Sequence, residues 1–151
     1  MPLDRDVELD ELYREIILDH YRSPRNRGSL AQPTVTGEGD NPLCGDEVEL
    51  GLEIRDGQIV DVRFQGTGCS ISQASASMMT AAIKGLSLEE AEALFEAFKD
   101  VMYGADEVDA EALGDLEALQ GVRKFPVRVK CATLAWNTLE EALEAYRKGQ
   151  G

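Results

Sequence analysis

The chain has 151 residues, of which 43% are hydrophobic and 29% are charged, a composition typical of a globular protein with one core. Its formal net charge of −14 disfavours nucleic acid and anionic membranes as partners, because both repel an acidic surface. No apolar run approaches the roughly 20 residues that span a bilayer, and the acidic N-terminus differs from a signal peptide. These properties predict one cytoplasmic domain over residues 1–151.

The first predicted element is an amphipathic helix over Asp6–Tyr21. The residue before Pro24 avoids the α conformation, so Ser23-Pro24 is the signal that ends this helix after Tyr21. We interpret His20, the only histidine, as a packed or boundary helix residue and not as a ligand. The apolar stripe of this helix, at helical spacing, consists of Leu9, Leu12, Tyr13, Ile16, Ile17 and His20.

An antiparallel sheet is predicted after this helix. Asp56-Gly57 is typical of a hairpin turn and joins two strands with a two-residue alternation of apolar side chains. A weaker extended segment, Thr34–Gly39, predicts a third antiparallel strand. The predicted inward residues are Val48, Leu50, Leu52 and Ile54 in one hairpin strand and Val60, Val62 and Phe64 in the other.

The rest of the chain predicts helices. One covers Ser70–Lys84 and stops at Gly85, and a capping box at Ser87 begins another that ends near Met102. The acidic stretch Asp106–Gln120 predicts a short helix. The fold class is therefore α+β, with a small antiparallel three-stranded sheet covered on one face by about five helices.

Pro126 is in the position of a first-turn proline and begins the last predicted helix. Its apolar stripe consists of Ala132, Ala135, Leu139, Ala142, Leu143 and Tyr146. We interpret Met78 and Met79 as core residues. Trp136 and Phe125 fit either the core or a partner surface.

The three cysteines lie at predicted boundaries between elements. An odd number of cysteines in a reducing compartment disfavours disulfides. Cys44 is in the loop Asn41–Asp46, in which Pro42 fixes φ and Gly45 permits a sharp turn. This loop lets Cys44 and Asp46 face one point.

Cys69 and Cys131 are predicted at the N-terminal ends of helices. The partial positive charge of a helix N-terminus favours the thiolate of Cys69. Ser70 and Ser72 are expected to cap the free amides or to donate to the sulfur. Arg128 and Lys130 lie within three residues of Cys131 and favour its thiolate too.

Three thiolates and one carboxylate suit a four-coordinate zinc ion, and thiolates suit an iron–sulfur cluster equally well. The residues alone leave two interpretations open, a shared metal site or three unrelated buried cysteines, because the sequence has no Cys-x-x-Cys pair. A cysteine hydrolase is not expected, since the only histidine belongs to the first helix.

Three segments resemble the cysteine motifs of the NifU-like iron–sulfur scaffold family. They are Asn41–Asp46 (NPLCGD), Gly66–Ser77 (GTGCSISQASAS) and Lys130–Trp136 (KCATLAW), and Leu18–Asn26 (LDHYRSPRN) is similar to the family's first helix. The resemblance covers nearly the whole chain. It implies the NifU-like N-terminal domain fold, in which the cysteines and the aspartate meet at one exposed end.

Two features resemble the SufU branch of this family. Lys130 stands directly before the third cysteine, where IscU-type scaffolds carry histidine, and the segment before it is long, including Asp106–Phe125. The resemblance implies a SufS-like cysteine desulfurase as partner, from which the protein accepts persulfide sulfur. In that role it is a zinc-dependent sulfurtransferase that acts with the desulfurase and not a free-standing enzyme. The implied zinc ligands are Cys44, Asp46, Cys69 and Cys131.

Within that interpretation, we expect Cys44 to accept the sulfur and Arg128 to pair with Asp46 or with a released thiolate during exchange. The alternative is a scaffold on which the three cysteines hold iron or a [2Fe–2S] cluster. It would then pass the cluster to apo iron–sulfur proteins or to other SUF assembly proteins. A third interpretation is a structural zinc site in a protein-interaction module.

Overall fold

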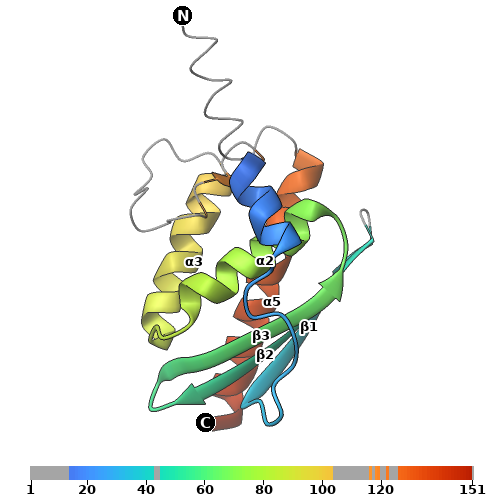
Figure 1. The fold of residues 1–151 in the computed structure, drawn as a ribbon. Coiled ribbons are helices and arrows are strands. Elements are labelled where there is room, and N and C mark those ends of the chain that lie inside the picture. The colour runs from blue at the N-terminus through green and yellow to red at the C-terminus, as the bar shows by residue number, and fades with distance from the viewer. Residues whose placement is uncertain are drawn as a thin grey trace, which may run out of the picture.

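The computed structural model describes residues 14–42, 45–103, 116, 118–119, 122 and 126–150. Three antiparallel strands, β1 (Val35–Asn41), β2 (Asp46–Arg55) and β3 (Gln58–Thr67), lie in the order β1-β2-β3. The described helices are 14–22, α2 (Ser70–Ile83), α3 (Leu88–Met102) and α5 (Pro126–Gln150), with short helical turns at 116, 118–119 and 122. These elements confirm the predicted α+β class (Figure 1).

Alternation along the strands separates a covered face of the sheet from a solvated one. The predicted inward residues of β2, Val48, Leu50, Leu52 and Ile54, are all buried. Helix α5 packs on β1 and β2, and α2 packs on β3 and against α5 (Figure 1). The core therefore lies between one face of the sheet and these helices.

Glycines in β1 let α5 approach the strand closely. Gly37 and Gly39 face inward, and a Cβ added to Gly39 would lie 2.2 Å from the Thr138 Oγ1 atom. A side chain there would push the helix away from the sheet. Close packing of α5 on β1 brings the N-terminal part of α5 to the end of the β1–β2 ladder (Figure 1).

The inward residue at the start of β3 differs from the prediction. Val60 is 36% exposed whereas Ile59 is fully buried, so the prediction of Val60 as an inward residue is wrong. The pairing between β2 and β3 shifts between Glu53 and Ile54, because Glu53 pairs with Asp61 but Ile54 pairs with Ile59. Val60 is thus an extra residue, and it reverses the alternation from that point.

A hydrogen bond joins the helix over residues 14–22 to α2. His20 is buried, and its Nδ1 atom lies 2.8 Å from the Ser77 Oγ atom. The same hydroxyl oxygen accepts a hydrogen bond from the Arg25 backbone amide at 2.8 Å. This contact confirms His20 as a packed helix residue. The first residues of the predicted helix Asp6–Tyr21 lie outside the described part of the chain.

The remaining helices follow the sequence pattern. The Ser87 capping box at the start of α3 is confirmed, with the Glu90 amide donating to the Ser87 hydroxyl at 3.1 Å. Met78 and Met79 are buried, as predicted. Most of the predicted helix Asp106–Gln120 is outside the described residues. The structure describes three residues of that stretch, and all three are buried: Leu116, Ala118 and Leu119.

The stripe predicted for the last helix faces the core, with five of its residues buried and Tyr146 packed at the edge. Trp136 is fully buried, and its ring stacks on Phe95 and Phe98 at centroid distances of 5.9 and 4.9 Å. This places Trp136 in the core, while Phe125 lies outside the described residues. None of the described helices combines the length and apolar character that crossing a bilayer requires.

Candidate metal centre

Asp46 occupies the first position of β2, at the end of the β1–β2 ladder. It pairs with Asn41, the last residue of β1, and its side chain is only 1% exposed. The connection between the two strands contains Leu43 and Cys44, which lie outside the described residues. The ladder therefore fixes a buried carboxylate at this edge of the sheet.

Cys69 lies between β3 and α2, and the Asp46 carboxylate holds it there. The Cys69 backbone amide donates to Asp46 Oδ1 at 2.9 Å, and the Cys69 Sγ atom lies 3.9 Å from Asp46 Oδ2. One carboxylate oxygen thus fixes the loop before α2, and the other faces the sulfur. Cys69 is the N-cap residue of α2 but makes no side-chain capping hydrogen bond, which leaves its sulfur directed to the site.

Gly68 is required for this arrangement. It has a φ of +150°, and an added Cβ would lie 2.4 Å from Asp46 Oδ1 and 2.7 Å from Ser72 Oγ. The carboxylate therefore reaches the Cys69 amide through space that any other residue would fill.

Cys131 belongs to the second turn of α5 and is fully buried. The Ser75 hydroxyl donates to the Ala132 carbonyl oxygen at 2.5 Å, which joins α2 to α5 beside this cysteine. The Cys131 Sγ atom lies 3.8 Å from the Val127 carbonyl oxygen and 3.9 Å from the Asn41 Nδ2 atom.

The ligand atoms of Asp46, Cys69 and Cys131 all lie within 4.8 Å of one another. In a tetrahedral zinc site with Zn–S bonds of about 2.3 Å, two sulfur ligands lie about 3.8 Å apart. The observed spacing is slightly wider, and small side-chain movements would close it. These anionic donors can therefore hold a metal ion. Cys44, the fourth predicted ligand, lies outside the described residues.

The resemblance implies that the site lies at an exposed end. Of the three predicted ligands that the structure describes, Asp46 and Cys131 are buried and Cys69 is partly exposed.

The Ser72 hydroxyl makes a different contact from the predicted one. It donates to the Cys69 carbonyl oxygen at 3.1 Å, one turn back along α2.

Asn41 is a site residue that the sequence analysis did not assign. It is only 7% exposed, at an inward-facing position of β1 after Val35, Gly37 and Gly39. A polar residue in the inward register of a strand was the available signal. Its significance depends on α5, which brings Cys131 to it from a distant part of the sequence.

Two cations precede Cys131 in α5. Arg128 and Lys130 are both exposed, one on each side of the buried Val129. The structure thus places the predicted exchange partner Arg128 at the solvent side of the helix that carries Cys131.

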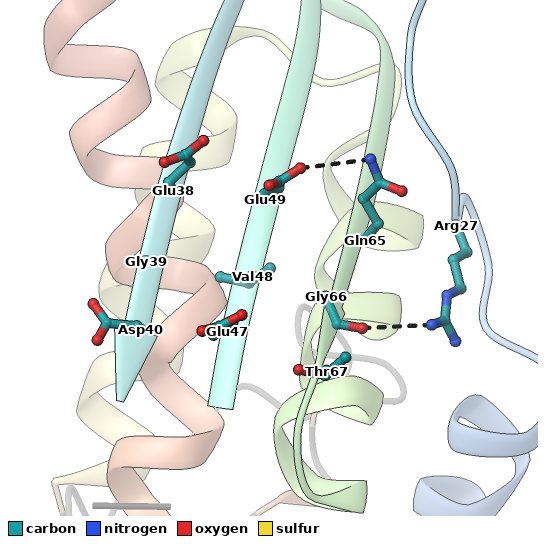
Figure 2. A pocket seen from close by; sticks show the side chains of 10 residues that line it. All are labelled: Arg27, Glu38, Gly39, Asp40, Glu47, Val48, Glu49, Gln65, Gly66 and Thr67. Atoms are coloured by element: carbon teal, nitrogen blue, oxygen red, sulfur yellow. Dashed lines mark hydrogen bonds between the residues drawn. The ribbon is translucent and has the colours of Figure 1, made fainter. Parts of the chain in front are cut away.

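The solvated face of the sheet beside the site is acidic. Glu38 lies opposite Glu49 and Asp40 opposite Glu47 across the β1–β2 ladder. Figure 2 shows these four carboxylates on the front of the strands, with Arg27 at the edge beside β3. The Arg27 guanidinium donates to the Gly66 carbonyl oxygen at 3.4 Å.

The family model described as the NifU-like N terminal domain matches residues 12–132, a range that contains Asp46, Cys69 and Cys131. The chain belongs to the NifU-like family. This assignment confirms the family resemblance of the cysteine motifs.

Individual NifU-like relatives match most of the chain. The zinc-dependent sulfurtransferase SufU of Bacillus subtilis is 52% identical over 145 residues, which are 95% of this chain and 97% of the relative. The iron–sulfur cluster assembly scaffold protein IscU of Streptococcus pyogenes is 41% identical over 143 residues, 95% of this chain and 89% of the relative.

A solved NifU-like structure supports the fold. The SUF-system scaffold protein of Fervidobacterium islandicum is 39% identical and superposes with a TM-score of 0.81, covering 85% of this chain and 94% of the other. The similarity to SufU proteins extends to the three-dimensional arrangement of the sheet and helices.

Proposed function

We propose that this protein is an iron–sulfur cluster assembly protein of the SUF system that accepts persulfide sulfur from a cysteine desulfurase at a zinc site. One observation carries the proposal. The ligand atoms of Asp46, Cys69 and Cys131 converge within 4.8 Å in a chain 52% identical to a zinc-dependent sulfurtransferase. The fourth proposed ligand, Cys44, precedes Asp46 by two residues in the β1–β2 connection.

Bound zinc would keep the thiols deprotonated and hold them as ligands. Asp46 and Cys131 have different roles in this proposal. Asp46 holds the Cys69 amide with one oxygen and offers the other as a hard ligand among soft sulfurs. Cys131, buried in α5, is suited to remain in place during exchange.

Cys44 is proposed as the acceptor because Pro42 and Gly45 stand beside it in the sequence that connects β1 to β2, and a glycine-proline loop can move more readily than the start of a helix. Its thiolate attacks the outer sulfur of the desulfurase persulfide, and a new S–S bond forms while the original S–S bond breaks. The desulfurase cysteine leaves as a thiolate, so sulfur moves with no net oxidation or reduction. Docking of the desulfurase is proposed to loosen a ligand, and Arg128 to pair with the released group.

The setting we propose is the cytoplasm, where reducing conditions keep thiols free. The finer identity of the partner, a SufS-like desulfurase, rests on the family resemblance.

Elemental analysis and a transfer assay test the proposal. Protein purified without added metal is expected to contain one zinc ion per chain. Incubation with the desulfurase and cysteine should add one sulfur atom to Cys44, detected by peptide mass spectrometry. Cys44→Ala should fold, as judged by circular dichroism, but should accept no sulfur. Undiminished sulfur transfer to Cys44→Ala would contradict the role assigned to Cys44.

The second candidate function is a scaffold that builds a [2Fe–2S] cluster. The similarity to IscU scaffold proteins favours it, and thiolates are the usual cluster ligands. Anaerobic reconstitution with iron and sulfide separates the two functions. A stable chromophore that transfers to an apo-ferredoxin supports the scaffold, whereas zinc that iron does not displace supports the sulfur acceptor.

A further inference from the structure

We propose that Asn41 is a positioning residue whose side-chain amide donates a hydrogen bond to the Cys131 sulfur of the metal-bound site. This bond makes Cys131 the ligand that stays in place and does not attack sulfur, so exchange is directed to the other thiolates. The inference rests on the proposed function, because it presupposes a metal ion at these ligands.

Asn41 is held at the site by the sheet. Its backbone pairs with Asp46, so both residues end the same ladder, and its side chain faces inward. Burial limits the orientations that the amide can adopt, and the Nδ2 atom lies 3.9 Å from the Cys131 sulfur. Buried polar groups need hydrogen-bond partners within the protein, because water does not reach them. The buried Asn41 amide and the buried Cys131 sulfur lie close enough to serve each other in this way.

Two contacts that the Cys131 sulfur makes with described residues respond differently to metal binding. The contact with the Val127 carbonyl oxygen, at 3.8 Å, needs the proton of a thiol. A metal-bound thiolate has lost that proton, so it can no longer donate. The Asn41 amide supplies its own proton, and a hydrogen bond to an ionised acceptor is stronger than one to a neutral acceptor. The Asn41 contact is therefore the one that survives and strengthens.

The described thiols consequently have unequal surroundings. A hydrogen bond withdraws electron density from a thiolate and reduces its nucleophilicity, and Cys131 is in addition fully buried. Cys69 is partly exposed, and its sulfur faces Asp46, whose carboxylate accepts hydrogen bonds but donates none. This asymmetry assigns Cys131 the anchoring position.

The test replaces the amide and follows the sulfur spectroscopically. Asn41→Leu keeps the approximate size but removes the donor. Asn41→Ser is smaller, and its hydroxyl is too short to reach the sulfur. Asn137→Leu is the matched control, because Asn137 is exposed on α5. Each protein is loaded with cobalt(II), and the sulfur-to-cobalt charge-transfer band is recorded. Both Asn41 variants should shift the band to lower energy, and Asn137→Leu should leave it unchanged.

A second readout measures the reactivity of each sulfur. Zinc-loaded proteins are treated with iodoacetamide, and peptide mapping gives the rates at individual cysteines. Loss of one hydrogen bond should raise alkylation of Cys131 relative to Cys69 by about fivefold. Trp136 fluorescence, from the only tryptophan, establishes that each variant is folded.

The outcomes separate this inference from the proposed function. A native protein that binds neither zinc nor cobalt overturns the proposed function. A native protein that binds both, with Asn41 variants identical to it in band energy and alkylation pattern, overturns the inference alone. A red-shifted band with faster Cys131 alkylation in both Asn41 variants supports it.

Discussion

Gly68 is the residue that allows the loop before α2 to lie against the Asp46 carboxylate. Gly68→Ala would place a Cβ 2.4 Å from Asp46 Oδ1, so the carboxylate or the loop must move. The change should weaken zinc binding by about tenfold or more, because it displaces a proposed ligand and the amide that orients it. Competition for zinc with a chromophoric chelator measures the effect.

Gly57→Ala is the control for that substitution. Gly57 also has a positive φ, of 76°, but an added Cβ there would meet no atom within 4 Å, in the hairpin turn of β2 and β3. Both variants carry the cost of an alanine at positive φ, which lowers stability. Unchanged zinc affinity in Gly68→Ala, or equal losses in both variants, would contradict the steric explanation.

Local sequence indicated most candidate site residues but not all. Asp46, Cys69 and Cys131 were candidates because each stands in a short motif with glycine, proline or cations beside it, but those motifs alone left open whether the residues share one site. Asn41 was not a candidate, since its contact with Cys131 exists only through the packing of α5 on β1. Burial of Cys131 was missed for the same reason.

The capping box of α3 makes a prediction at the scale of the element. The Ser87 backbone amide donates to the Glu90 carboxylate at 3.0 Å, which, with the Ser87 hydroxyl, lowers the pKa of Glu90 from 4.5. A lowered folded-state pKa contributes stability at a pH above the unfolded value. That contribution is lost as the pH falls through the folded value.

Ser87→Ala should therefore lower the free energy of unfolding by about 1 kcal/mol near neutral pH. Urea unfolding at about pH 7 and at about pH 3 measures this loss of stability. The loss should be smaller at the lower pH, because Glu90 is protonated there. Glu90→Gln keeps an acceptor but has no charge to titrate, so its stability should depend less on pH in this range. A Ser87→Ala effect that is the same at both values would contradict the coupling to Glu90.

The acidic pairs on the solvated face of β1 and β2 predict a stabilising substitution. Like charges directly opposite each other in a ladder repel, as Glu38 and Glu49 do (Figure 2). Glu38→Lys should raise the free energy of unfolding by about 0.5 kcal/mol in low salt, and less at high ionic strength. Urea unfolding at low and at high salt concentration measures the change in free energy of unfolding under each condition.

The double variant Glu38→Lys with Glu49→Lys restores a like-charge pair and serves as the control. It should lose the gain in stability of the single variant, because two positive charges opposite each other repel as two negative charges do. If the double variant is as stable as the single one, the gain does not come from the cross-strand pair.

Element prediction was accurate where one segment contained its own signal. The alternation of β2, the Asp56-Gly57 turn and the Ser87 cap each involve neighbours in sequence, and each is present in the fold. Val60 shows the limit. Its outward position follows from a shift in pairing with β2, and a pairing shift has no counterpart in the alternation of one strand.

At the scale of the molecule, the apolar core is separate from the proposed metal site. Buried apolar residues such as Leu52, Phe64 and Trp136 pack between the sheet and the helices without using the site. Removing zinc with a chelator should therefore lower Tm but leave the helical circular dichroism unchanged at 25 °C. At free zinc about 1,000 times its Kd, the stabilisation is about 4 kcal/mol.

The same experiment decides between the proposed exchange site and a structural zinc site. Loss of helical signal on chelation at 25 °C would mean that the metal supplies the folding free energy, as it does in small structural zinc modules. Zinc added back to the chelated protein should restore the original Tm, which excludes irreversible damage as the cause of the shift.

The order of the site residues along the chain has a consequence for synthesis. Asp46 and Cys69 belong to the hairpin and the start of α2, whereas Cys131 belongs to α5, which is translated much later. A growing chain on the ribosome thus has three of the four proposed ligands, Cys44, Asp46 and Cys69, before it has the buried Cys131 sulfur. A metal ion can be retained by the full set only after α5 has been made and has docked on β1. A metal ion held by all four proposed ligands would therefore mark those copies of the protein whose translation and docking are both complete.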